Sequence, residues 1–342
     1  MRLLLLGGTR FVGRTVAELA SARGHEVTTF NRGRSGEDVV GIVAVRGDRE
    51  STDDLNRLAM RAKWDAVVDT SGFFPNVVAA SARALSASVE RYAFVSTVSV
   101  YSGWPLEPLS EASPLLACPP DAGPDFGADD PSGSPTQYGI LKAGCERAVA
   151  EVCPDDASLI VRPGVILGPH ETVGRLPWWL LRMARGGSVL APGRPSRGIQ
   201  PIDVRDVAGF ILDNLESKHA GTFNLTAPSG RDTFGGMLSA CREATGTEAE
   251  LVWVDDEVLV DAGVRQWTEL PLWRTSPGTW AVSSQRALEA GLSCRPLAET
   301  VRDTWAWLWA GGVAAADERL SEHGIDPVKE RALLDDWAAR TS

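Results

Sequence analysis

The sequence is poor in the side chains that hold metals and disulfides. Of its 342 residues only four are histidine and five are cysteine. No Cys-x-x-Cys pair occurs, and no histidine lies at ligand spacing from another histidine or a cysteine. An odd number of scattered thiols is typical of a reducing compartment. We therefore predict a protein without a metal site and without a disulfide framework; the cysteines are Cys118, Cys145, Cys153, Cys241 and Cys294.

The sequence also lacks a basic run and a long apolar run. It has 34 basic and 45 acidic side chains, for a net charge of −11. Nucleic acid and anionic membrane surfaces require a compensating basic face, and no run of about five basic residues supplies one. The opening apolar run, Leu3 to Leu6, is too short for a membrane helix or a signal-peptide core. We expect a cytoplasmic protein that acts on a small molecule, with neither nucleic acid nor membrane as partner.

What the sequence does contain is an alternation of short apolar strands and amphipathic helices. Strands are expected at 2–6, 26–30, 42–45, 65–69, 92–98 and 158–161, with helical stretches between them. Such alternation predicts an α/β fold, a Rossmann-type doubly wound parallel sheet. We assign residues 1–165 to this dinucleotide-binding domain and 166–342 to a smaller mixed α/β substrate lobe, from which 204–225 returns to the main sheet.

The first strand runs directly into a glycine-rich turn that opens a helix. Glycines allow a pyrophosphate to approach the backbone, and the amides at the start of the helix can receive its charge. The position of the turn between the first strand and the first helix makes dinucleotide binding the natural interpretation. The predicted contacts in this turn are Gly7, Thr9, Arg10, Phe11, Val12 and Gly13.

The second expected strand ends in Asn31 and Arg32, where an NAD site usually carries an acidic residue for the ribose hydroxyl. Arg32, with Arg10 from the first turn, can instead clamp a 2′-phosphate, because a guanidinium binds phosphate through two parallel hydrogen bonds. We therefore predict NADP as cofactor in preference to NAD.

Two further patterns carry acid–base chemistry. Tyr138 and Lys142 lie four residues apart on an expected helix, so the ammonium can stabilise a phenolate on the same face. The strand at 92–98 leads into Ser96, Thr97 and Ser99, whose hydroxyls belong at the carboxyl edge of the sheet where ligands bind. A hydroxyl there can hydrogen-bond a substrate oxygen while Tyr138 exchanges its proton.

In these motifs the sequence resembles the extended short-chain dehydrogenase/reductase group, the NAD(P)-dependent epimerase/dehydratase family. Its opening Gly-Gly-Thr-Arg-Phe-Val-Gly resembles an atypical branch, and the resemblance runs from Arg2 to about Leu225. It implies Thr97, Tyr138 and Lys142 as catalytic residues. It also implies a helix start at 202–208 and cofactor contacts at Asp48 with Arg49 beside it, Thr70, Ser71, Gly72, Ser96, Pro163, Gly164 and Val165.

Departures from the family pattern bear on the reaction. Sugar dehydratases of this family follow the catalytic threonine with Asp-Glu, whereas Val98 and Ser99 follow Thr97 here, so elimination lacks its catalysts. Arg194 and Arg197 do not lie at the offset usual for a nucleotide-sugar diphosphate. The leading interpretation is an NADPH-dependent ketone reductase. Two alternatives stay open: a sugar or sugar-nucleotide epimerase that oxidises its substrate transiently, and a non-catalytic NADP-binding or RNA-associated protein.

Substrate recognition is expected from two regions of unusual composition. Residues 103–137 hold eight prolines and six acidic residues but no lysine or arginine, which is typical of a solvated loop or of a lid. Ten of the twelve tryptophans lie beyond residue 165, and Trp305, Trp307 and Trp309 cannot share one helix face. We name Ser99, Trp267 and Trp273 as candidate substrate contacts, and the tryptophan-rich half allows for a homodimer.

Overall fold

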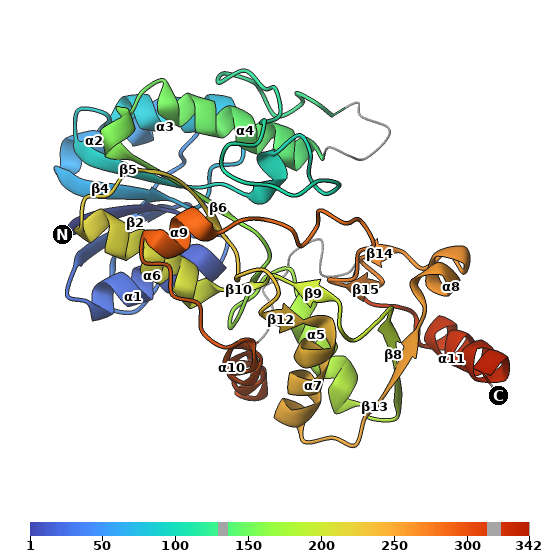
Figure 1. Ribbon diagram of the computed structural model, residues 1–342. Helices are drawn as coiled ribbons and strands as arrows, with labels where there is room; N and C mark the ends of the chain where they lie inside the picture. Colours follow the sequence, from blue (N-terminus) through green and yellow to red (C-terminus); the bar gives the residue numbers. More distant parts are fainter. Residues whose placement is uncertain (129–135, 313–322, 342) are drawn as a thin grey trace.

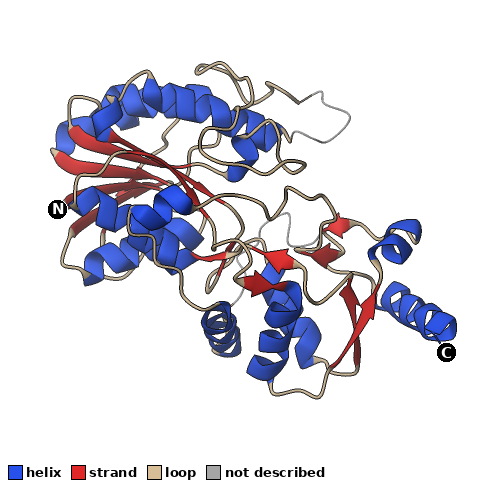
Figure 2. Cartoon of the chain, in the orientation of Figure 1, coloured by secondary structure: helices blue, strands red, loops and turns tan. Residues whose placement is uncertain are grey.

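The computed structural model describes residues 1–128, 136–312 and 323–341. Its centre is a sheet of seven parallel strands in the order β3-β2-β1-β4-β5-β6-β11, covered by helices on both faces (Figures 1 and 2). The strand order reverses between β1 and β4, which creates the crevice where such sheets bind their ligands. The strands are β1 (Arg2–Leu6), β2 (Glu26–Asn31), β3 (Val43–Arg46), β4 (Trp64–Asp69), β5 (Val89–Val95), β6 (Ser158–Pro163) and β11 (Gly221–Leu225).

The continuous leucine run of β1 is explained by burial on both faces of the sheet. Leu3 and Leu5 enter one hydrophobic core, and Leu4 and Leu6 enter the other. Successive side chains of a strand point to opposite faces, so a central strand needs apolar residues at every position. β1 thereby lies between β2 and β4 and delivers the glycine turn to the sheet edge.

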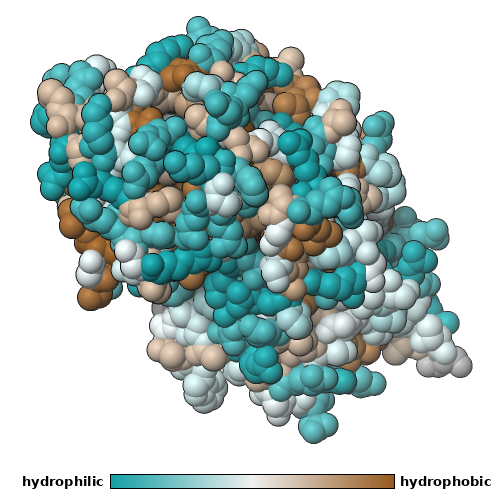
Figure 3. Space-filling model, turned by 60° about the vertical axis from the view of Figure 1, so that its left-hand side comes forward, coloured by the Kyte–Doolittle hydropathy of each residue, from teal (hydrophilic) through white to brown (hydrophobic). Residues whose placement is uncertain are grey.

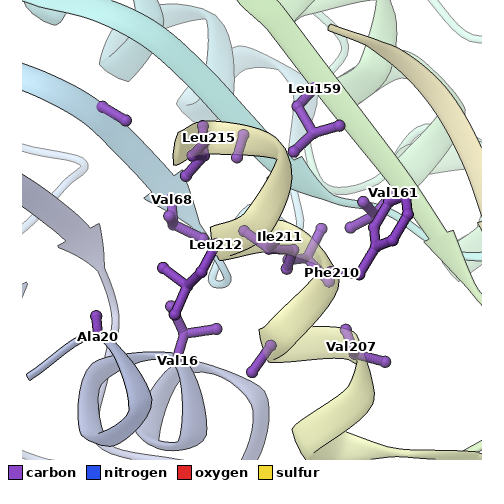
Figure 4. Packing of buried hydrophobic residues seen from close by; sticks show 14 of the residues in the cluster. Val16, Ala20, Val68, Leu159, Val161, Val207, Phe210, Ile211, Leu212 and Leu215 are labelled. Atoms are coloured by element: carbon purple, nitrogen blue, oxygen red, sulfur yellow. The ribbon is translucent and has the colours of Figure 1, made fainter. Parts of the chain in front are cut away.

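Two sets of helices cover the sheet. On one face α1 (Phe11–Ala22) packs against α6 (Val204–Glu216), and Figure 4 shows the apolar side chains of α6 directed toward α1 and the strands. On the other face lie α2 (Thr52–Arg61), α3 (Pro75–Leu85) and α4 (Gln137–Ala150). The packed residues labelled in Figure 4 are Val16, Ala20, Val68, Leu159, Val161, Val207, Phe210, Ile211, Leu212 and Leu215.

The structure confirms the predicted Rossmann-type sheet but changes one strand that matters for the site. The strand expected at 92–98 is β5, Val89–Val95, so it ends three residues earlier. The Ser96 amide donates to the Val161 carbonyl, and the chain then leaves the sheet in a short 3-10 turn, η1 (Val98–Val100). The Thr97 side chain accepts from the Ser99 amide and so caps this turn.

The second lobe has its own core of buried residues. Its main helices are α5 (Arg175–Ala184), α7 (Phe234–Thr245), α10 (Leu297–Trp309) and α11 (Pro327–Thr341), and β8 (Ser188–Pro192) pairs with β13 (Glu250–Val254). In Figure 1 these elements lie to one side of the large sheet. The remaining elements are β7 (Ile166–Leu167), β9 (Gly198–Ile199), β10 (Ile202–Asp203), β12 (Asp232–Thr233), α8 (Asp256–Asp261), β14 (Gln266–Trp267), β15 (Leu270–Pro271), α9 (Gln285–Glu289) and η2 (Asp155–Ala157).

Two late segments return to the first domain. β11 pairs with β6, and α6 covers the sheet. The sequence did not indicate the second return: α9 packs on β11, and Ala287 and Leu292 join the core beside α1 and α6. The chain therefore crosses between the two lobes several times, and these crossings hold the lobes together around the site.

The surface and the helices add two observations. On the face in Figure 3, hydrophilic residues predominate and hydrophobic residues form small separate patches. Among the described residues no helix combines the length and apolarity needed to cross a bilayer.

Candidate active site

A cavity of about 640 Å³ lies at the carboxyl edge of the sheet and is lined by both lobes. The first domain contributes the glycine turn, the ends of β4, β5 and β6 and the start of α4. The second lobe contributes residues around the start of α5 and the segment 267–282. A cavity at this edge, next to the reversal of strand order, is the expected ligand site of such a sheet.

The glycine turn forms one wall, with Gly7 to Gly13 lining the cavity. Gly7 and Gly8 have φ angles of +109° and +95°, which side-chain-bearing residues rarely adopt. A Cβ atom on Gly13 would lie 2.6 Å from the Thr70 Oγ1 atom and 2.9 Å from the Gly8 amide nitrogen. No side chain of the described residues caps the start of α1. Its first amides therefore face a cradle that only glycine permits, and a pyrophosphate fits there.

Of the contacts predicted in and beside the loop after β4, some line the cavity and others do not. Thr70 and Ser71 line the cavity, whereas Gly72 does not. The prediction that Arg49 contacts the cofactor is wrong, because its guanidinium turns inward. It donates two 2.8 Å hydrogen bonds to the buried carboxylate of Asp69 and a further one to the Ser71 hydroxyl. Arg49 thus supports the loop from behind.

The residues predicted for the adenosine end lie outside the cavity wall, apart from Arg10. Arg32 lies 3.8 Å from the carboxylate of Asp48, and both side chains are exposed. The Asn31 side chain accepts from the Gly33 amide at 2.8 Å and so shapes the turn after β2. Arg10 lines the cavity, and its Nε donates to the Ser35 carbonyl. The contribution of these groups to cofactor choice stays a prediction.

The end of β5 provides the predicted row of hydroxyls. Ser96, Thr97 and Ser99 all line the cavity. The Thr97 hydroxyl is 3.3 Å from that of Ser99 and fixes the turn that presents both. The Ser96 Oγ atom is buried and has no hydrogen-bond partner in the described parts of the chain. An unpaired buried hydroxyl in a cavity wall is available to a polar ligand.

Tyr138 and Lys142 lie in the first turns of α4, as the spacing predicts, and both line the cavity. The Lys142 side chain is buried, and its Nζ donates to the carbonyl oxygens of Gly72 at 2.9 Å and Val95 at 2.5 Å. Burial lowers the pKa of Lys142 to about 8, because desolvation disfavours the ammonium. An ammonium has three donors, so one is left for a ligand beyond these two carbonyls.

Of the remaining predicted contacts, all but one line the cavity. Pro163, Gly164 and Val165 line the cavity at the end of β6. Trp267 lines it as well, but the prediction for Trp273 is wrong. Trp273 is fully buried in the core of the second lobe, and its indole donates to Asp256 at 2.8 Å. Two tryptophans six residues apart in an irregular segment cannot be assigned to wall or core from spacing alone.

Several cavity-lining residues escaped the sequence analysis. They lie in loop segments and at the start of α5, whose routes the sequence pattern does not fix, and we call this part of the lining the second wall. The only available signals were the acidic 103–137 region, of which residues 129–135 lie outside the described residues, and the tryptophan-rich stretch 267–280. The residues are Trp104, Glu171, Arg175, Arg274, Thr279 and Trp280.

Glu171 is the acidic residue of this wall. Its carboxylate accepts from the amides of Arg175 at 2.7 Å and Leu176 at 3.3 Å and so caps α5. Burial raises the pKa of Glu171 to about 7 in spite of these bonds and the Arg175 charge.

His170 and the tryptophans of α10 do not line the cavity. The His170 ring packs on Trp307 at 5.1 Å, while Trp305 and Trp309 contact each other, so the three tryptophans of α10 do divide between faces. Over residues 1–128, 136–312 and 323–341 no cluster of histidine, cysteine or acidic side chains could hold a metal, and the five cysteines are unpaired.

A parallel sheet with a glycine-rich first turn and a Thr–Tyr–Lys set at one cavity defines a dinucleotide-dependent oxidoreductase of the short-chain dehydrogenase/reductase type. The chain belongs to the NAD dependent epimerase/dehydratase family, whose model matches residues 3–226. It is an enzyme of that family.

Relatives with curated names differ in role. The chain is 27% identical over 260 residues to the epimerase family protein SDR39U1 of Bos taurus. The aligned region covers 73% of this chain and 82% of that protein. It is 26% identical to the chloroplast stem-loop binding protein of 41 kDa b of Arabidopsis thaliana, over 73% and 65% of the two chains. It is 31% identical to the 2′-dehydrokanamycin reductase of Streptomyces kanamyceticus, over 64% and 62%.

Solved structures agree on the fold. The enzyme WbmH of Bordetella bronchiseptica in complex with NAD+ matches with a TM-score of 0.68 at 18% identity, over 91% of this chain and 99% of that one. A UDP-glucose 4-epimerase matches with a TM-score of 0.68 at 16% identity, over 91% and 98%.

Proposed function

We propose that this enzyme is an NADPH-dependent ketone reductase in which Thr97, Tyr138 and Lys142 are the catalytic residues. The observation that carries the proposal is that all three line one cavity with the glycine turn. The similarity to a protein named as a 2′-dehydrokanamycin reductase supports reduction as the net reaction.

The roles follow from chemistry and position. The Thr97 hydroxyl polarises the substrate carbonyl by donating a hydrogen bond to its oxygen. The Tyr138 phenol gives its proton to that oxygen as the carbonyl becomes an alcohol. The Lys142 ammonium, held by the Gly72 and Val95 carbonyls, binds the cofactor ribose with its third donor and favours the phenolate that Tyr138 leaves.

The residues that would hold the cofactor are the amides of the glycine turn for the pyrophosphate and Thr70, Ser71, Pro163, Gly164 and Val165 nearer the nicotinamide. When bound, the reduced nicotinamide supplies the hydride that the carbonyl carbon accepts. The preference for NADP rests on Arg10 and Arg32 and on the absence of an acidic side chain at the end of β2, which ends in Asn31.

Two alternatives have specific support. Epimerisation is favoured by the family and by the fold of enzymes named UDP-glucose 4-epimerase. An RNA-associated role has the chloroplast stem-loop binding protein as its support, but the net charge of −11 opposes it. Tightly retained oxidised cofactor in purified protein would favour epimerisation, and co-purified RNA would favour the second alternative.

We further propose a cytoplasmic enzyme that forms a homodimer. The reduced cysteines and the net negative charge support the compartment. Mass measurement by size-exclusion chromatography with light scattering tests the dimer.

The deciding experiment for the function compares Tyr138→Phe with the wild-type enzyme in NADPH oxidation against a panel of ketones. Loss of the phenolic proton should lower kcat by at least a thousandfold and leave NADPH binding within about twofold, measured by fluorescence. Full turnover by the variant would remove Tyr138 from the mechanism. Retained NADPH binding would show that the variant is folded.

A further inference from the structure

The second wall of the cavity holds a guanidinium that contacts two indole rings. The Arg274 Cζ atom lies 4.7 Å from the ring centroid of Trp267 and 4.9 Å from that of Trp104. All three residues line the cavity. Cation–π contacts of this kind fix a guanidinium in place without neutralising its charge.

The segment that carries Arg274 is fixed by its own hydrogen bonds. The Trp267 amide donates to the Trp273 carbonyl at 2.9 Å, and the Arg197 side chain donates to the Arg274 carbonyl at 3.0 Å. Trp267 has a φ of +73°, an unfavourable conformation for a bulky residue, which the surrounding contacts must hold in place. The guanidinium is therefore preorganised at the cavity wall.

In the described parts of the chain no ion pair to this guanidinium is seen. Its Nη1 atom is buried and finds no hydrogen-bond partner among residues 1–128, 136–312 and 323–341. Burial lowers the pKa of Arg274, because desolvation disfavours the charged guanidinium. Leaving a buried donor of a charged group unpaired is unfavourable. A ligand anion would satisfy it.

The charges around Arg274 favour the same ligand. The Arg175 guanidinium also lies over the Trp267 ring, with its Cζ atom 5.2 Å from the ring centroid. Among the described residues Glu171 is the only carboxylate that lines the cavity, and backbone amides already occupy it. In a protein with a net charge of −11 this wall is thus a local concentration of positive charge.

Three more hydrogen-bond donors of this wall have no acceptor among the described residues. The indole nitrogens of Trp104 and Trp280 and the hydroxyl of Thr279 are buried and have no hydrogen-bond partner in the described chain. Donors of this kind suit a ligand rich in oxygen.

The size of the cavity limits the ligand. Its volume of about 640 Å³ lies within the range of about 300–1,000 Å³ that holds one drug-sized ligand. The same cavity includes the glycine turn and must also admit the nicotinamide end of the cofactor. The room that is left suits a small substrate.

We propose that Arg274, in contact with Trp104 and Trp267 and assisted by Arg175, binds the anionic group of a small oxo or hydroxy substrate. The anion is a carboxylate or a phosphate, because a guanidinium fork fits both. This inference rests on the proposed function for its reaction but assigns Arg274 a binding role of its own.

The first experiment compares matched substrates with the wild-type enzyme. Acetoacetate is paired with methyl acetoacetate, dihydroxyacetone phosphate with dihydroxyacetone, and aminoacetone supplies a cation. We expect the better anionic member to exceed its neutral partner at least tenfold in kcat/KM, and that pair identifies the anion as carboxylate or phosphate. Equal or faster turnover of the neutral members or of aminoacetone would overturn the proposal.

The second experiment substitutes the guanidinium. Arg274→Met should lower kcat/KM for the anionic member at least tenfold and change the neutral member less than twofold. Arg265→Met is the matched control, since Arg265 is exposed on the same segment and does not line the cavity. Arg274→Gln replaces the first variant if circular dichroism shows that Arg274→Met is unfolded. An unchanged anion preference in the folded variant would contradict the proposal.

A binding measurement separates this inference from the proposed reaction. Malonate and inorganic phosphate are titrated by calorimetry into the NADP-saturated wild-type protein and into the Arg274 variant. We expect at least tenfold weaker binding of the preferred anion to the variant. If the anions bind in this way and no ketone oxidises NADPH, the reductase proposal fails and the anion site stands. If neither anion binds the wild-type protein, the anion site is refuted.

Discussion

The Lys142 ammonium donates to the carbonyl oxygen of Gly72 at 2.9 Å. This bond joins α4, which carries Tyr138, to the loop after β4, whose Thr70 lies against Gly13 of the first turn. A second bond to the Val95 carbonyl ties the same ammonium to the end of β5, next to Ser96 and Thr97. Lys142 therefore connects the glycine turn with Thr97 and Tyr138, the two hydroxyl groups that we propose as catalytic.

Lys142 should make cofactor binding dependent on pH. Because burial lowers its pKa to about 8, the ammonium is present below that pH and is lost above it. We expect the NADPH dissociation constant of the wild-type enzyme to rise between pH 7 and 9, measured by fluorescence titration. Lys142→Met should bind roughly tenfold more weakly at pH 7, with little change over this range, since its side chain does not titrate. An equally steep pH dependence in the variant would contradict this role.

Arg32 should determine the choice between the two dinucleotides. Arg32→Asp removes a partner for the 2′-phosphate and places a carboxylate where the ribose hydroxyl can donate to it. We expect the ratio of kcat/KM for NADPH over NADH to fall at least tenfold. Arg61→Asp makes the same charge change at the end of α2 and should leave the ratio within twofold. An unaltered ratio in Arg32→Asp would refute the arginine clamp.

Glu171 should make the free enzyme less stable as the pH rises. Its folded-state pKa of about 7 lies above the ordinary value of 4.5, so the folded state holds its proton more tightly than the unfolded chain. The resulting penalty is absent below pH 4.5, grows up to pH 7 and is constant above it, reaching up to about 3 kcal/mol. Glu171→Gln should abolish this pH dependence.

The measurement is urea unfolding of wild type and Glu171→Gln at pH 5 and pH 8. We expect the variant to gain stability relative to wild type at the higher pH. Glu90→Gln, at an exposed position of β5, should show no such gain. A constant difference between wild type and Glu171→Gln at both pH values would contradict the elevated pKa.

Gly13 should not tolerate a side chain. In Gly13→Ala the methyl group would lie 2.6 Å from the Thr70 hydroxyl oxygen and 2.9 Å from a backbone nitrogen. The clash should cost about 1–3 kcal/mol and shift the turn, so cofactor affinity should fall at least tenfold. Gly198→Ala is the control, because no heavy atom lies within 4 Å of its Cβ position. Calorimetric titration with NADPH checks both; equal affinities would disprove the close approach.

Short-range patterns were enough to predict the glycine turn and the helix that carries Tyr138 and Lys142. The glycine turn follows β1 at once, and Tyr138 and Lys142 share one turn of α4, so their geometry is fixed within a few residues. The orientation of Arg49 could not be predicted from short-range patterns. An arginine next to Asp48 could face the cofactor or the core, and only the position of Asp69, twenty residues further on, decides for the core.

The sequence by itself determined the sheet, its glycine turn and the acid–base helix, because strand and helix periods and turn chemistry act over a few residues. Only the tertiary structure decided that Trp267 lines the cavity while Trp273 joins the core, and that Arg274 meets Trp104 from a segment far away in the chain. The physical reason is that the second wall is assembled from irregular segments. Their mutual packing, rather than any local preference, sets which side chains face the ligand.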